Sequence, residues 1–591
     1  MSYGLLALHH GLSGLDYAIV VGYMAVMLGM GVYFSGRQTS SEEYFVGRRS
    51  LPPLVVGLSI VATLLSTITY LAAPGDMIQH GLAFATSILS VPLWLVIVLR
   101  YWVPFFMRYR LTSVYEYAGM RFNQATRWLS ASLFILMRFG WMGMIIYTAT
   151  GAVAQMTADA PQRIGAWTGV ELTPPQYFYA LLIGMGLIAT FYTFLGGIRV
   201  VIWTDAVQFV VMVGGAVFAI GYIWYATERG PLAWWHDATR LQRAAPVWFG
   251  WQASGTRPAW LAWMTSQRTV FFVVLNAFFW RICTHCSDQV ATQRYFSTAG
   301  VRQALRSNVV SAVGDFALVA TLGLVGLALL SFYTRSSVVA ATASETSGEW
   351  NPAALTAFAG GFDPTNADHA KDAYPIFIVE YMPAGLAGLI MAALFAAAMS
   401  SIDSGINSIS AVVTTDFYRV AASEGASPQT EMRVARWTTL ATGVAITLVA
   451  FLITAVIAAD PQNRNLVDLS IRVFNLFLGP LAAIFIAGIF FPWVGSAAII
   501  AACIFGSGFS VLLSFWGPLF AALAATFPSL EGLAAAAPSP LLVTPLSTTL
   551  TVFAAALLGG LLPSPSPAST MGHTWWTRHL LPEAETLGNA D

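Results

Sequence analysis

The sequence predicts an all-α protein that crosses a membrane about thirteen times. Of its 591 residues, 57% are hydrophobic and 9% are charged, and the mean hydropathy is +0.68. Soluble domains carry about 25% charged residues, so this chain could not cover itself with polar surface in water. Its apolar runs are also long enough to span a bilayer, which takes roughly 20 residues. The net charge is zero, so a lipid bilayer is the expected partner and nucleic acid is not.

The expected spans are separated by short polar segments. They lie near residues 15–35, 52–75, 83–107, 127–156, 176–195, 200–226, 269–290, 307–333, 384–417, 434–458, 466–490, 492–515 and 542–562. Arginines concentrate in the loops after odd-numbered spans, including Arg48, Arg108, Arg199, Arg294 and Arg419. The positive-inside rule then predicts an outer N-terminus and a cytoplasmic C-terminus, and the expected location is a bacterial inner membrane.

A polar stripe in the ninth span is the strongest sign of a binding site. Ala397, Ser400, Ser401, Ser404 and Ser408 follow helical spacing, and Asp403 lies among them. Hydroxyl and carboxylate oxygens are ligands that hard cations prefer. Small residues also serve helix packing in membranes. Packing needs no carboxylate, so Asp403 favours an ion or proton site.

Two further polar segments accompany this stripe. In the second span, Ser66, Thr67 and Thr69 precede Pro74-Gly75, a pattern that predicts a helix interrupted within the membrane. A proline-kinked helix with back-bonded hydroxyls is the alternative. After Gly196-Gly197, Asp205 enters the sixth span, where it could bind a cation or cap a helix N-terminus.

Isolated charges occur in other spans. Arg138 and Arg281 could hold a substrate carboxylate in a bidentate contact. They could equally balance Asp288 and Asp315 inside the bundle, and we favour this balancing role slightly.

Several of these segments together resemble the sodium:solute symporter family. The matching runs are Glu43 to Arg48, Gly196 to Gln208, Gln293-Arg294-Tyr295, Ala392 to Ser404 and Asp416-Phe417-Tyr418. They occur in the family's order over roughly residues 15–515. The resemblance implies a LeuT-type fold of two inverted five-helix repeats with extra helices outside.

The expected organisation follows from this resemblance. Residues 1–51 would form an N-terminal outer segment and first span, and residues 52–490 the transport core. Within the core, 52–226 would be the first repeat and 269–490 the second. Residues 491–562 would add C-terminal spans and 563–591 a cytoplasmic tail. The family also implies a break in the seventh span, although its apolar stretch has no proline or glycine.

The resemblance also implies two cation sites. Carried over by position, the first sodium site uses the backbone oxygens of Ala62, Leu65 and Ala397 and the hydroxyls of Ser400 and Ser401. A second site, for sodium or a proton, aligns to Asp205, Ser400, Asp403 and Ser404. One or two sodium ions are therefore expected, and no other metal or cofactor.

Within the family, the chain resembles bacterial sialic-acid and sugar symporters. Trp141 and Ile88 stand where a carboxylate-binding arginine and a substrate-contacting glutamine are found in the sialic-acid symporters, which argues against sialic acid. The candidate substrate residues are Ser66, Thr69, Tyr70, Phe84, Arg138, Trp141, Arg281 and Gln289.

We therefore expect a sodium-coupled symporter that imports a small polar organic solute, with a sugar or sugar acid favoured. A monocarboxylate or amino acid symporter, a proton-coupled relative and a transporter-like sensor are the alternatives. No enzymatic activity is expected, and a monomer would suffice, although oligomers are not excluded.

Overall fold

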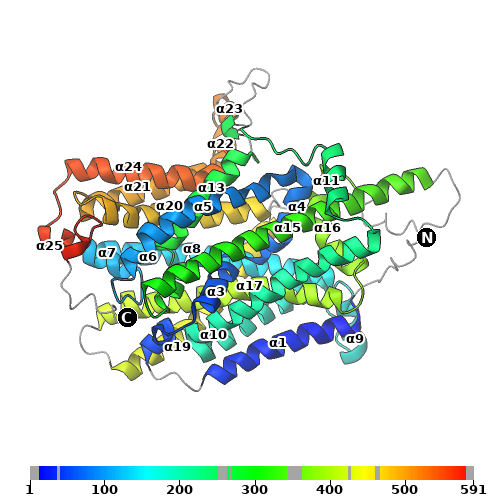
Figure 1. The fold of residues 1–591 in the computed structure, drawn as a ribbon, viewed down its shortest axis with the longest axis horizontal. Helices are drawn as coiled ribbons and strands as arrows, with labels where there is room; N and C mark the ends of the chain where they lie inside the picture. The colour runs from blue at the N-terminus through cyan, green and yellow to red at the C-terminus, as the bar shows by residue number, and fades with distance from the viewer. Residues whose placement is uncertain are drawn as a thin grey trace.

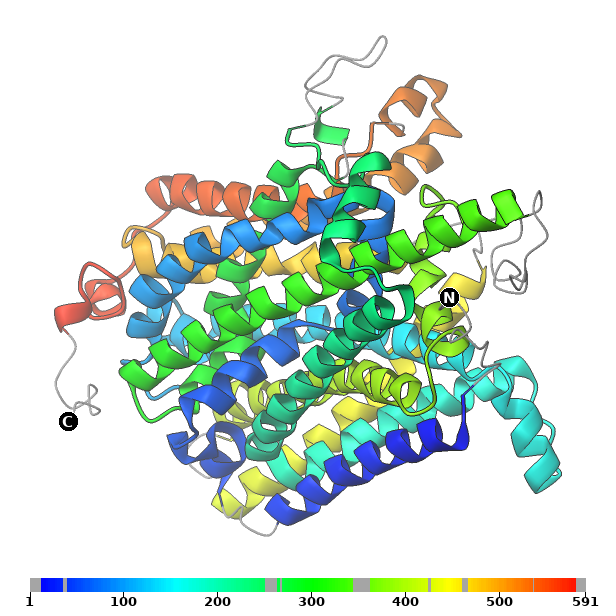
Figure 2. The same ribbon diagram turned by 45° about the vertical axis from the view of Figure 1, so that its right-hand side comes forward.

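The computed structural model describes residues 12–35, 40–249, 263–265, 268–343, 362–422, 427–459, 466–534 and 536–580. Parts of the expected outer segment 1–51, of both core repeats' connections and of the tail 563–591 lie outside these residues. Every regular element in the described residues is helical. Figures 1 and 2 show the long helices side by side in one bundle, with α17 inside it and with α1 and α24 on opposite sides.

The helices of the first half begin near the N-terminus and reach the middle of the chain. They are α1 (Gly14–Ser35), α2 (Ser41–Val46), α3 (Pro53–Leu64), α4 (Thr67–His80), α5 (Val91–Ile97), α6 (Val103–Phe106), α7 (Tyr115–Arg121), α8 (Gln124–Met156), α9 (Ala160–Thr168), α10 (Pro174–Thr227) and α11 (Pro231–Arg240). A 3₁₀ segment (Gly81–Ser90) and a π segment (Val98–Trp102) connect α4, α5 and α6.

The helices of the second half complete the bundle. They are α13 (Val270–Ser287), α14 (Gln289–Phe296), α15 (Val301–Ala343), α16 (Ala367–Glu380), α17 (Leu386–Val412), α18 (Arg419–Ala421), α19 (Pro428–Ala459), α20 (Leu466–Phe490), α21 (Ser496–Ser514), α22 (Trp516–Ala524), α23 (Glu531–Ala534), α24 (Val543–Leu561) and α25 (Pro567–Thr570). A π segment (Val413–Tyr418) extends α17, and short 3₁₀ turns lie at Gly47–Arg49, Pro528–Leu530, Pro540–Leu542 and Arg578–Leu580.

Eleven helices in the described residues are long and apolar enough to cross a membrane, or twelve if the bent pair Ser41–Arg49 and Pro53–Leu64 is one span. One of the eleven, α10, has 54 residues and would be about 80 Å long if straight, against a hydrocarbon core of about 30 Å. It is broken at Gly197, where φ is 55° and ψ is −160°. Because α10 contains both the fifth and the sixth expected spans, the helices account for about thirteen crossings.

The second expected span is interrupted, but at a different place from the predicted one. It ends as α3 at Leu64, Leu65 and Ser66 are extended, and α4 begins at Thr67. Pro74 lies inside α4. A Cβ at Gly75 would come within 2.6 Å of the Ala370 carbonyl, so the glycine allows α16 to pack closely. The Pro-Gly pair therefore serves packing, and the break precedes it.

The seventh expected span is also interrupted. Asp288 adopts an extended conformation between α13 and α14, with φ −88° and ψ 117°. Its side chain accepts a hydrogen bond from the Val290 amide and so caps the start of α14. The sequence of this span has no proline or glycine that would predict a break. The break occurs instead at Asp288, whose carboxylate caps the next helix. α17 packs against α10, α8 and α3, which places its polar stripe between the first and second halves of the chain.

Candidate functional site

The end of α3 and the middle of α17 meet through serine hydroxyls. Ser400 Oγ donates to the carbonyls of Ala62 (3.0 Å) and Ala397 (3.3 Å), and Ser401 Oγ donates to the carbonyl of Thr63 (3.1 Å). The last four carbonyls of a helix have no partner within it, and those of Ala62 and Thr63 belong to this set. The break at Leu65 therefore leaves carbonyl oxygens that face the hydroxyls of α17.

These atoms suit a small cation. The residues implied for the first sodium site are buried, and they supply carbonyl and hydroxyl oxygens only. Leu65 is extended, so its carbonyl is not taken up by the helix that ends before it. Hard cations take oxygen ligands of this kind. The chemistry of the donor set thus fits sodium.

Three of the four residues implied for the second site, Asp205, Asp403 and Ser404, lie together, whereas the Ser400 hydroxyl bonds to the Ala62 and Ala397 carbonyls. Asp403 accepts from the Tyr192 hydroxyl (2.5 Å) and from the amide and hydroxyl of Ser404 (2.5 and 3.1 Å). Ser404 Oγ is also 3.4 Å from the carboxylate of Asp205. Asp205 in turn accepts from two hydroxyls of α3, those of Ser59 (2.6 Å) and Thr63 (3.0 Å). Two buried carboxylates are thus linked by one serine.

Arg294 is the residue of this cluster that sequence reasoning misplaced. Its expected position was a cytoplasmic loop, but it lies in α14 and is fully buried. The guanidinium contacts Asp205 at 2.9 Å, Ser59 Oγ at 2.8 Å and Ser404 Oγ. Asp205 is therefore balanced by a cation of the protein itself and does not cap a helix. The cluster holds two carboxylates and one guanidinium, so it has room for one more positive charge.

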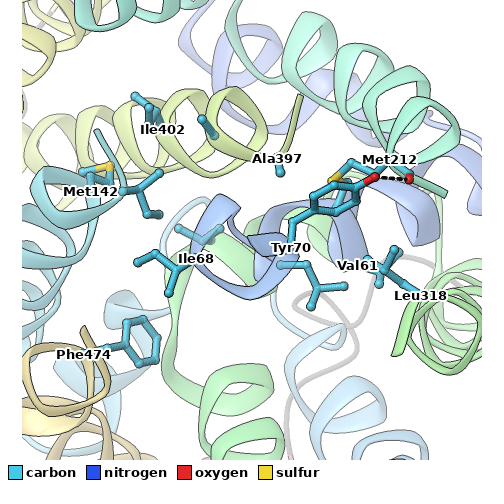
Figure 3. Close-up of a cluster of buried hydrophobic side chains, with 14 of the residues drawn as sticks. Val61, Ile68, Tyr70, Met142, Met212, Leu318, Ala397, Ile402 and Phe474 are labelled. Carbon is cyan, nitrogen blue, oxygen red and sulfur yellow. Dashed lines mark hydrogen bonds between the residues drawn. The ribbon is translucent and has the colours of Figure 1, made fainter. Parts of the chain in front are cut away.

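A cavity of about 230 Å³ lies beside the break in α3–α4. Thr69, Phe84, Trp141 and Arg281 of the candidate substrate residues line it, and so does Leu65 of the first sodium site. Figure 3 shows Ile68 and Phe474, two other lining residues, near each other on one side of α4. The rings of Trp141 and Phe474 are in contact, with centroids 4.7 Å apart. The cavity therefore has an aromatic wall next to a candidate ion site.

The other four candidate substrate residues do not line this cavity. Tyr70 points away, and its hydroxyl donates to the Met212 carbonyl at 3.1 Å (Figure 3). Ser66 is buried, and its hydroxyl has no hydrogen-bond partner in the described part of the chain. Arg138 is fully buried and paired with Asp288. Gln289 accepts from the Val114 amide (2.9 Å) and donates to the Thr112 carbonyl (2.7 Å).

The charges of the cavity are paired. Arg281 forms a buried ion pair with Asp315, so both arginines singled out from the sequence balance carboxylates of the bundle. Sequence reasoning missed a second pair at the cavity, between Arg268 and Asp76 at 2.8 Å. Asp76 directly follows Pro74-Gly75 in α4, but Arg268 is distant in sequence. No local motif around Arg268 predicts that it pairs with Asp76.

Packed protein adjoins the cavity at Arg281. Every residue from Arg281 to Thr298 is buried. The Arg138–Asp288 pair lies in this region, Tyr115 donates to the Ser287 carbonyl at 2.9 Å, and Gln289 ties α14 to residues 112–114. We call residues 281–298 with residues 112–115 the seal. An open path through the seal would require these contacts to separate.

Comparisons with known proteins agree with this geometry. Residues 44–506 match the profile of the sodium:solute symporter family. The sodium/sialic acid symporter of Proteus mirabilis is 28% identical over 485 residues, 81% of this chain and 86% of that protein. The human sodium/iodide cotransporter is 27% identical, over 86% of this chain and 70% of its own length. The sodium/glucose cotransporter of Vibrio parahaemolyticus is 25% identical, over 86% of both chains. These relatives carry different solutes with one kind of ion.

A solved structure shares the fold. A Na⁺-coupled sialic acid symporter, in a substrate-bound outward-open state described as revealing a novel Na⁺ site, superimposes with a TM-score of 0.72. It is 25% identical and covers 94% of this chain and 99% of its own. The expected LeuT-type arrangement of helices is therefore confirmed.

Proposed function

Because the chain belongs to the sodium:solute symporter family, we propose that it imports a small polar organic solute, a sugar or sugar acid, together with sodium. It is a multi-pass membrane protein, and its bacterial relatives support a place in a bacterial inner membrane. The arginine-rich loops support an outer N-terminus and a cytoplasmic C-terminus.

One observation carries this proposal. The hydroxyls of Ser400 and Ser401 lie against the carbonyl oxygens at the interrupted end of α3, next to a cavity lined by Leu65 and Thr69. We propose that sodium binds to Ala62, Leu65, Ala397, Ser400 and Ser401 and holds α3 against α17. Sodium would thereby complete the wall of the solute cavity, so solute and ion would bind together.

We further propose that the cluster of Asp205, Ser400, Asp403 and Ser404 takes a second sodium ion or a proton. Its two carboxylates and single guanidinium leave one negative charge uncompensated in a buried place. One charge falling through 100 mV yields about 2.3 kcal/mol. A tenfold ion gradient adds about 1.4 kcal/mol. One ion could thus sustain a solute gradient of several hundredfold, and two could sustain about 10⁵-fold.

Transport would proceed by alternating access. The cavity and the seal are compatible with a state that is open at one end and closed at the other, as in the outward-open relative. Release would require the seal to separate. The relatives include monocarboxylate transporters, so a monocarboxylate or amino acid is the alternative solute, and proton coupling is the alternative ion.

The test is the thermal stability of the purified protein in sodium and in potassium. Sugars, sugar acids, monocarboxylates and amino acids would be added to each. A ligand at 100 times its Kd stabilises by about 2.7 kcal/mol. We expect sodium alone to stabilise the protein and one solute class to add to this effect only in sodium. Equal stability in both cations would contradict sodium coupling.

A matched pair of variants locates the site. Ser401→Ala removes a hydroxyl from the proposed sodium site and should weaken sodium-dependent stabilisation and uptake at least tenfold. Ser410→Ala removes a buried hydroxyl of the same helix that donates to the Ala435 carbonyl at 2.7 Å, away from the site. It should keep the sodium response. Normal sodium dependence in Ser401→Ala would refute the assignment of the first site.

A further inference from the structure

The charged side chains around the cavity indicate what kind of solute it can bind. This inference rests on the proposed function. The ionisable side chains in the described lining of the cavity are Asp76, Arg268, Arg281 and Asp315. These four side chains form two ion pairs, so together they carry no net charge. His80, which is outside the lining, lies with its Nδ1 3.4 Å from Asp76 Oδ1. The Arg281–Asp315 pair is nearly inaccessible, with 8% and 7% of the two side chains exposed. A solute with a net charge would meet no uncompensated partner here, and burying an unpaired charge is strongly unfavourable.

The polar atoms of the lining that lack a hydrogen-bond partner are acceptors. Asp76 Oδ2 and Asn276 Oδ1 are buried and have no hydrogen-bond partner in the described residues. Both are acceptors, and buried acceptors without partners are costly, so a bound solute should supply donors. Hydroxyl groups do so. A carboxylate is an acceptor only and would lie against further acceptors.

The remaining wall is aromatic. Phe84, Trp141, Trp280 and Phe474 line the cavity, and Phe474 contacts both tryptophan rings, with centroids 4.7 and 5.8 Å away. Large flat side chains offer apolar area to a ring's C–H face while polar groups elsewhere fix its orientation. The volume of about 230 Å³ lies below the roughly 300–1,000 Å³ of sites for drug-sized ligands. It suits one sugar ring.

We propose that the cavity selects a neutral polyhydroxylated ring of monosaccharide size. The Arg281–Asp315 pair determines this specificity, because Asp315 occupies the guanidinium that would otherwise bind an acid. Acids and amines of the same ring are excluded by the balanced charges.

The test compares solutes that share one ring and differ at a single neutral, acidic or basic group. Glucose, glucuronate and glucosamine, and the galactose equivalents, are titrated in sodium against the purified full-length protein, with thermal stability and proteoliposome uptake as readouts. We expect one neutral sugar to bind at least tenfold more tightly than its acid and its amine. Tighter binding of either charged form would overturn the proposal.

Two variants then test the pair. Asp315→Asn frees Arg281, and the ratio of acid to neutral affinity should rise at least tenfold. The double variant Arg281→Gln/Asp315→Asn has no free cation and should not show this gain. An unchanged ratio in Asp315→Asn would contradict the role of the pair. Should that variant fail to fold, Asp76→Asn frees Arg268 at the same cavity, and the same rise is expected there.

The sodium response separates this proposal from the proposed function. Protein that is stabilised by sodium alone, but binds none of the neutral sugars, would overturn the solute class and leave sodium coupling standing. Protein that binds a neutral sugar equally well in sodium and potassium would support the solute class and contradict the coupling.

Discussion

Arg294 contributes a fixed positive charge to the centre of the protein. It contacts Asp205, Ser59 and Ser404, all of them buried. Arg294→Gln leaves the carboxylate of Asp205 without its cation, and breaking a buried pair in this way costs about 3–5 kcal/mol. We expect a large fall in thermal stability. The double variant Asp205→Asn/Arg294→Gln should recover part of it, and equal losses in single and double variants would contradict a mutual role.

A substitution of Asp403 tests whether a second ion binds. Its carboxylate accepts three hydrogen bonds and has no ion-pair partner in the described residues. Asp403→Asn keeps the size of the side chain and removes the charge, so the cluster no longer needs a further cation. We expect the number of sodium ions or protons moved per solute to fall by one, as measured by reversal potentials in proteoliposomes. An unchanged stoichiometry would show that nothing binds at Asp403.

At the scale of residues, the sequence could predict which side chains lie together where one motif contains several polar residues. Ser400 of the stripe in the ninth span contacts the Ala62 carbonyl, and Ser404 lies 3.4 Å from Asp205. The ion-binding roles that the family resemblance implies for these residues stay predictions. Arg294 was misplaced because an arginine near a span end is usually cytoplasmic, whereas here α14 turns it inward to meet a carboxylate. Gln289 and Tyr70 are polar groups within spans, but they bond to backbone groups that are distant in sequence, which no local pattern reveals.

Gly197 is the residue at which α10 is broken into two helices. Its φ of 55° is unfavourable for other residues, and a Cβ there would lie 2.7 Å from the Tyr44 carbonyl. Gly197→Ala should therefore destabilise the protein by about 1–3 kcal/mol. Gly214→Ala lies on the same helix, where nothing comes within 4 Å of the added Cβ, and should be neutral or slightly stabilising. Thermal unfolding of both variants measures the difference.

At the scale of elements, span positions followed from hydropathy because lipid requires a fixed length of apolar helix. The breaks within helical spans were harder to locate from the sequence. The break at Leu65 has no proline or glycine, and it forms because α17 supplies partners for the carbonyls that α3 leaves free. A break stabilised by another element cannot be located from the residues at the break.

We expect the contacts of the seal to affect the balance between closed and open states of the whole molecule. Gln289→Ala removes two hydrogen bonds between α14 and residues 112–114, each worth about 0.5–1.5 kcal/mol. The closed form should lose population by roughly five- to a hundredfold relative to the open one. In a Cys283→Ser/Cys503→Ser background, alkylation of buried Cys286 should accelerate. Gln176→Ala removes a capping glutamine at the start of α10, remote from the seal, and should leave alkylation unchanged.

The burial of the seal also limits how fast the proposed transport cycle could run. Since residues 281–298 are all buried, a solute that passes them would have to wait for collective helix motion. Such motion takes microseconds to milliseconds. Flux then grows with the number of copies in the membrane rather than with solute concentration once the cavity is saturated.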